Sequence, residues 1–111
     1  MISGVTKEIA GESHTFRLKT RAKRAIEGRL ECGFMALMTS LESDYSINAL
    51  TVIFAESMND GAGASDDAAE DVIDNLGDEK AAELLGKIVE AAFPDAKAGA
   101  AKNPKGASRS K

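Results

Sequence analysis

The hydrophobic pattern of this chain changes its period near residue 20, and this change constrains the fold more than any other feature. Before that point apolar and polar residues alternate, first around Val5 to Ile9 and again around Phe16 to Leu18. The segment between the two runs, Ala10 to Ser13, contains a glycine that suits a tight turn. Two alternating runs around such a turn predict a β-hairpin. Because an isolated hairpin is only marginally stable in water, its apolar face must pack on other elements.

After residue 20 the apolar residues recur at helical spacing and predict about five short helices. Their predicted N-caps are Thr20, Ser46, Ser65 and Asp78. Their predicted breaks and ends are Gly33, Glu42 to Asp44, a flexible loop over Asn59 to Ala64, Gly77, and Pro94. We therefore expect an α+β fold, in which an N-terminal hairpin packs on these helices. Residues 1–94 are the expected single globular domain.

The last part of the chain has a different composition. Residues 95–111 consist mainly of Ala, Gly, Lys, Ser and Asn, which bury too little apolar surface to offset the entropy of ordering. This segment is expected to be a disordered, Lys-rich tail. It carries a net charge of +4, which leaves −8 on residues 1–93.

The body of the chain separates its charges along the sequence. Basic residues gather between Arg17 and Arg29, whereas all the charged residues from Glu56 to Glu79 are acidic. The basic cluster and the tail would suit nucleic acid, but the negative body opposes its approach, so specific nucleic-acid binding is not expected. The acidic row Asp66, Glu70 and Asp74 is expected to be a solvated helix face, with a basic protein partner or a metal ion as alternatives.

The sequence offers little material for catalysis. It contains one histidine, His14, and one cysteine, Cys32, too few for a metal site or for a nucleophile with its base. No phosphate-binding or dinucleotide motif is present. We expect His14 to be structural or exposed and Cys32 to be a small buried residue. The chain is thus predicted to be a cytoplasmic non-enzyme without metal, cofactor or membrane span.

The succession of these elements resembles a known family. The segments GVTKEIAGESHTFRLKTRAKRAIEGRL, FMALMTSLES, INALTVIFAESMNDGAG and AAELLGKIVEAAFPD follow one another over residues 4–95. Their order is similar to that of the small tail proteins of gene transfer agents and related phages, which are described as tail-tube or tail-assembly chaperone proteins. The residues Phe34, Met35 and Met38 depart from the Leu- and Ala-rich pattern of that family.

The resemblance implies a non-catalytic tail-assembly chaperone that acts in the cytoplasm of a bacterial host. Such a protein binds the tape-measure protein, helps to recruit tail-tube subunits, and can associate with itself. One alternative is a structural tail component, at the tube or the tube end, that stays in the virion tail. The other is a small nucleic-acid-associated regulator, suggested only by the basic residues.

The last predicted helix is the candidate surface for a protein partner. It has more apolar residues than one narrow face can bury. The candidate partner-binding residues are Leu84, Leu85, Ile88, Val89 and Phe93. Three methionines, Met35, Met38 and Met58, would add an adaptable surface. For both groups the alternative is an ordinary place in the core.

Overall fold

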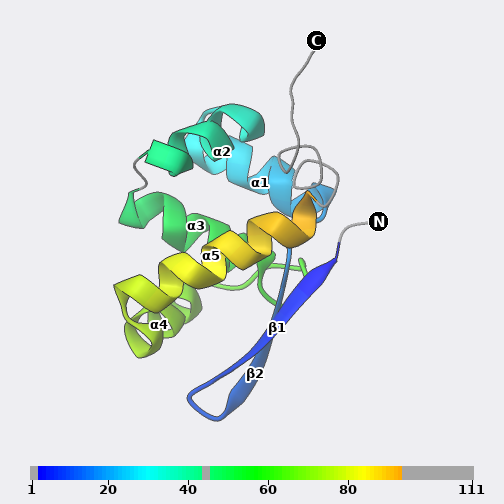
Figure 1. The fold of residues 1–111 in the computed structure, drawn as a ribbon. Coiled ribbons are helices and arrows are strands. Elements are labelled where there is room, and N and C mark those ends of the chain that lie inside the picture. The colour runs from blue at the N-terminus through cyan, green and yellow to red at the C-terminus, as the bar shows by residue number, and fades with distance from the viewer. Residues whose placement is uncertain (1–2, 44–45, 94–111) are drawn as a thin grey trace.

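The computed structural model describes residues 3–43 and 46–93, which form a β-hairpin followed by five helices (Figure 1). The elements are β1 (Gly4–Ile9), β2 (Glu12–Arg17), α1 (Thr20–Leu30), α2 (Phe34–Ser43), α3 (Ile47–Ser57), α4 (Asp66–Leu76) and α5 (Asp78–Ala92). This architecture confirms the predicted α+β fold. The predicted tail over residues 95–111 lies outside the described residues.

The hairpin is antiparallel and turns within two residues. Ile9 pairs with Glu12, so the turn consists of Ala10 and Gly11 alone and is shorter than the predicted one. Both turn residues have positive φ angles, 53° and 82°, as the twist of a two-residue hairpin requires. The alternation along β2 places Phe16 in the core, where it is fully buried.

Helix α3 lies at the centre of the molecule and is buried on most of its surface. Its buried residues are Ala49, Leu50, Val52, Ile53, Phe54, Ala55 and Ser57. Helices α1 and α4 pack on α3, and α5 runs from α4 towards the start of β1 (Figure 1). There the amide of Ser3 donates to the carbonyl of Ala91 at 3.3 Å. The buried apolar side chains of all the elements form one core.

Two of the predicted N-caps are confirmed. The Ser46 hydroxyl accepts from the amide of Ala49 at 2.9 Å, and the Ser65 hydroxyl accepts from the amide of Ala68 at 3.1 Å. Each serine therefore satisfies one of the amides left unpaired at the start of its helix.

The other two predicted N-caps are wrong by one residue. Helix α1 has Lys19 as its N-cap, and α5 has Gly77, so neither helix is capped by a side chain. Gly77 ends α4 as predicted, but its φ of 84° also makes it the direct link into α5. Asp78 is therefore the first residue of α5 and not its N-cap.

Two predicted helix ends also need correction. Helix α1 ends at Leu30 because Glu31 adopts a left-handed conformation with φ 56°, a role predicted for Gly33. Helix α2 continues to Ser43, whereas the polar residues after Leu41 predicted a break.

The loop after α3 is well packed, although its composition predicts a flexible segment. The Gly63 amide donates to Met58 at 2.9 Å, and the Ala64 amide donates to Ala55 at 2.7 Å. The Asp60 amide donates to the carbonyl of Thr15 at 2.9 Å, which ties the loop to β2. Gly61 is buried against the chain between β2 and α1.

Candidate functional site

The structure places the predicted partner-binding residues of α5 largely in the core. Leu84, Leu85 and Ile88 are only 2%, 5% and 1% exposed, because this face of α5 packs on the hairpin, α3 and α4. A partner could reach these three side chains only if α5 moved away from the core. Leu84, Leu85 and Ile88 thus belong to the hydrophobic core, which was the alternative to partner binding for this face of α5.

Val89 and Phe93 are partly buried and pack against the core. The ring of Phe93 contacts that of Phe34 with centroids 5.8 Å apart. The ammonium group of Lys23 lies 4.9 Å from the Phe93 ring centroid and 5.8 Å from that of Phe34. These contacts attach the end of α5 to α1 and α2. A role for Phe93 in partner binding stays a prediction, but the ring already has partners within the chain.

In the part of the chain that the structure describes, Met35 and Ile47 are the large apolar side chains that remain exposed. Their exposed fractions are 64% and 54%. Met35 lies in the first turn of α2, and Ile47 is the first residue of α3. Of the other two methionines predicted to be adaptable surface, Met38 is partly buried and Met58 is a core residue at 3% exposed.

A hollow of about 310 Å³ opens between the end of α1, α2 and the start of α3. Its apolar walls include Leu30, Leu37 and Leu41, and Cys32 also lines it. Cys32 is exposed, so the prediction of a buried cysteine is wrong. The reason is that α1 ends at Leu30, which leaves Cys32 on the turn towards α2. We use the name α2–α3 surface for this hollow together with Met35 and Ile47, the exposed apolar side chains at the starts of α2 and α3.

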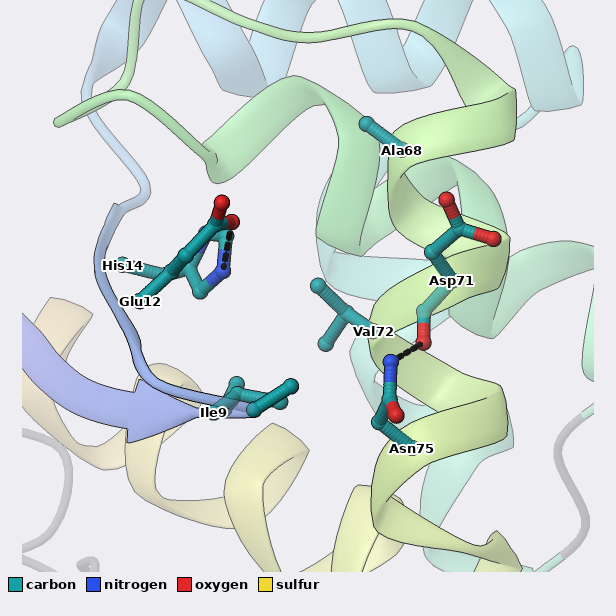
Figure 2. A pocket seen from close by; sticks show the side chains of 8 residues that line it. Ile9, Glu12, His14, Ala68, Asp71, Val72 and Asn75 are labelled. Atoms are coloured by element: carbon teal, nitrogen blue, oxygen red, sulfur yellow. Dashed lines mark hydrogen bonds and ion pairs between the residues drawn. The ribbon is translucent and has the colours of Figure 1, made fainter.

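A second pocket, of about 280 Å³, lies between the hairpin tip and α4 (Figure 2). Its walls include His14 and Glu12 from β2, and Asp71 and Asn75 from α4. His14 is half-buried, and its Nε2 atom lies 3.7 Å from Oε1 of Glu12. No sequence pattern pointed to this pocket, because it joins residues from two elements that are far apart along the chain.

The two charge blocks of the sequence meet at one surface of the folded chain. Arg17 contacts Asp60 at 2.6 Å. Arg21 and Arg29 contact the two carboxylate oxygens of Glu56 at 3.1 and 3.2 Å. These ion pairs join β2 and α1 to α3 and the loop that follows it.

Arg29 also contacts Asp66 at the start of α4, with 2.6 Å between Nη2 and Oδ2. This hydrogen bond holds the pKa of the Asp66 carboxyl below its usual range. The same bond, with a smaller contribution from Glu56, raises the pKa of Arg29. The ion pairs of Arg17, Arg21 and Arg29 within the chain leave less positive charge for a nucleic acid.

The acidic row of α4 is largely solvated. Asp66, Glu70 and Asp74 are exposed, as expected for the outer face of an amphipathic helix, and Asp66 is also paired with Arg29. Within residues 3–43 and 46–93, no three acidic, histidine or cysteine side chains are close enough together to hold a metal ion. None of the helices in these ranges combines the length and apolarity needed to cross a membrane.

Comparison with models of known protein families, with characterised proteins and with solved structures finds no significant match to this chain.

Proposed function

We propose that this protein is a non-catalytic tail-assembly chaperone of the phage and gene-transfer-agent type. In this proposal it binds the tape-measure protein in the cytoplasm of a bacterial host and helps to recruit tail-tube subunits around it. The segments that carry the family resemblance, residues 4–95, cover nearly the same part of the chain as the described fold.

The observation that carries the proposal is the α2–α3 surface. Met35 and Ile47 expose apolar area at the starts of α2 and α3, and a hollow lined by leucines opens between these two helices. The rest of the large apolar side chains of the described fold are buried or partly buried. A long helical tape-measure protein presents apolar stripes that aggregate unless they are covered. An apolar surface with a flexible methionine suits the binding of such helices, because methionine adapts to different shapes.

Helix α2 is held in place mainly by α1 and by the packing of Phe34 on Phe93. A helix with few neighbours can shift slightly and widen the hollow beside it, as the low-stability parts of binding proteins commonly do. This property supports α2, rather than α5, as the element that meets the partner.

The hairpin favours a chaperone over a subunit of the tail tube. The described residues contain a single two-stranded sheet, and the carbonyl of Thr15 on β2 is already bonded to the loop at Asp60. A tube ring needs more β-structure with open edges than this hairpin offers.

The proposal is tested by co-expressing the protein with the tape-measure protein encoded near it. We expect the tape-measure protein to become soluble and to co-purify with this chain. If the tape-measure protein stays insoluble and unbound, and this chain is found in purified particles, the protein is a structural tail component and the chaperone proposal fails.

A further inference from the structure

We infer that the pocket between the hairpin tip and α4 binds a lysine or arginine side chain of a protein partner. The pocket combines an apolar floor with carboxylates on two separate elements (Figure 2). This combination matches the two parts of a basic side chain, an aliphatic stem and a cationic head.

The floor of the pocket is made by Ile9 at the end of β1 and by Ala68 and Val72 on α4. Ile9 is 5% exposed and Val72 is 3% exposed, so the floor is fixed by the core and does not depend on mobile side chains. An aliphatic stem placed here would itself leave water, mainly against the partly exposed Ala68, since Ile9 and Val72 are already covered.

The lining of the pocket also contains hydrogen-bond acceptors. Glu12 comes from β2, where its Oε1 atom lies 3.7 Å from Nε2 of His14, and Asp71 comes from α4, so the hairpin and the helix each supply one carboxylate to the pocket lining. The side-chain amide of Asn75 donates to the backbone carbonyl of Asp71 at 2.8 Å, which fixes Asn75 with its oxygen as a further acceptor. Charge-assisted hydrogen bonds of ammonium and guanidinium groups to such carboxylates are stronger than neutral ones.

The size of the pocket favours one side chain over a larger ligand. Its volume of about 280 Å³ is at the lower limit of the roughly 300–1,000 Å³ that small-molecule sites occupy.

The net charge of −8 on residues 1–93 also attracts a basic partner.

The pocket is distant from the point where the chain leaves α5. It lies at the turn end of β1, whereas the end of α5 meets the opposite end of β1 through Ser3 and Ala91. A lysine beyond α5 would have to span the length of the hairpin to reach the pocket, and the third variant described below distinguishes this source from a separate partner.

The test is an NMR titration of the full-length chain with Nα-acetyl-lysine amide, and with Nα-acetyl-norleucine amide as the probe without the ammonium group. We expect the lysine probe to shift the amide signals of residues 9–14 and 68–75 in a saturable way, and the norleucine probe to bind at least about tenfold more weakly. Equal binding of the two probes, or no saturable shift with either, would overturn the inference.

Two matched variants test the role of the carboxylate. Asp71→Asn removes a carboxylate from the pocket and is expected to weaken the lysine probe about tenfold. Asp74→Asn makes the same change one turn further along α4, outside the pocket lining, and is expected to change the affinity less than about twofold. Equal losses in the two variants would show a general charge effect and would contradict a specific site.

A third variant distinguishes the source of the basic side chain. It replaces the basic residues of the tail, Lys97, Lys102, Lys105, Arg109 and Lys111, by glutamine. We expect the pocket signals of this variant, without probe, to match those of the native chain. A shift of the pocket signals would show that the tail itself fills the pocket and would overturn the assignment to a partner.

The inference takes from the proposed function only that the partner is a protein. The lysine probe can bind even if the tape-measure protein does not, and the tape-measure protein can bind through the α2–α3 surface even if the lysine probe fails. The two proposals can therefore fail separately.

Discussion

The ring of Phe16 on β2 packs against the ring of Phe54 on α3, with centroids 5.4 Å apart and an angle of 53° between the ring planes. Both side chains are fully buried. This tilted contact is of the kind that aromatic pairs prefer. It joins the hairpin, which would be marginal by itself, to the central helix of the fold.

Phe16→Ala is therefore expected to lower the free energy of unfolding by about 3–5 kcal/mol, because it leaves a cavity under the hairpin. Urea unfolding followed by circular dichroism measures this loss. The control is Val5→Ala, since Val5 pairs with Phe16 across the hairpin but is only partly buried. If the two substitutions cost the same, the hairpin is not attached to the core through Phe16.

Gly61→Ala is expected to destabilise the protein by at least about 1 kcal/mol. Gly61 has a φ of 89°, and a Cβ atom there would lie 2.8 Å from Cγ of Lys19 and 3.0 Å from the carbonyl oxygen of Arg17. The substitution would thus push the loop away from the chain between β2 and α1. Thermal or urea unfolding measures the effect.

Gly28→Ala is the matched control for Gly61→Ala, and we expect it to raise the free energy of unfolding rather than lower it. Gly28 lies inside α1, and a Cβ atom there would meet nothing within 4 Å. Alanine in a helix is better than glycine by about 0.5–1 kcal/mol, so this variant should be more stable than the native chain. A destabilised Gly28→Ala would show that the helix packs more closely at this point than the structure indicates.

The ion pair between Arg29 and Asp66 predicts how the stability of the protein changes at low pH. Since Arg29 lowers the pKa of the Asp66 carboxyl in the folded state, the pair contributes stability above the unfolded-state pKa of the carboxyl. This contribution is lost as the pH falls through the lowered folded-state pKa. The stability difference between the native chain and Asp66→Asn should thus shrink as the pH falls below about 5, and continue to shrink below the unfolded-state pKa of about 3.9. Urea unfolding at a series of pH values measures it.

Asp67→Asn is the control for this experiment, because Asp67 shares the first turn of α4 and its interaction with the helix dipole. The native chain and Asp66→Asn should converge at low pH by more than the native chain and Asp67→Asn do. Equal convergence would mean that the helix dipole, and not Arg29, acts on Asp66.

Much of the fold was predictable from the sequence because it depends on local patterns. The alternation around Phe16 predicted the hairpin, and the serines at 46 and 65 predicted two helix starts that the structure confirms. The errors concern helix ends and N-caps, whose exact positions local sequence patterns do not determine. Glu31, rather than Gly33, adopts the left-handed conformation that ends α1, and Gly77 serves two helices at once.

The surfaces were harder to predict than the fold. Periodicity showed that α5 has a wide apolar face, but only the three-dimensional packing shows that the hairpin and two other helices cover it. The pocket around His14 and Asp71 depends on the approach of two elements whose residues are more than 50 positions apart. The ion pairs between the basic and the acidic segments could not be predicted either, because they form only when the fold brings these distant segments together.

The central claim, that this chain binds the tape-measure protein through the α2–α3 surface, is tested most directly by a pull-down with charged variants. Met35→Lys and Ile47→Lys together place charge on the exposed apolar side chains. Ala62→Lys, at an exposed position of the loop beyond the other end of α3, adds charge elsewhere. Circular dichroism should show all variants folded. We expect the double variant to lose at least about tenfold in recovered tape-measure protein, since each charge must be desolvated to bind, and Ala62→Lys to match the native chain. Unchanged recovery with the folded double variant would contradict the account.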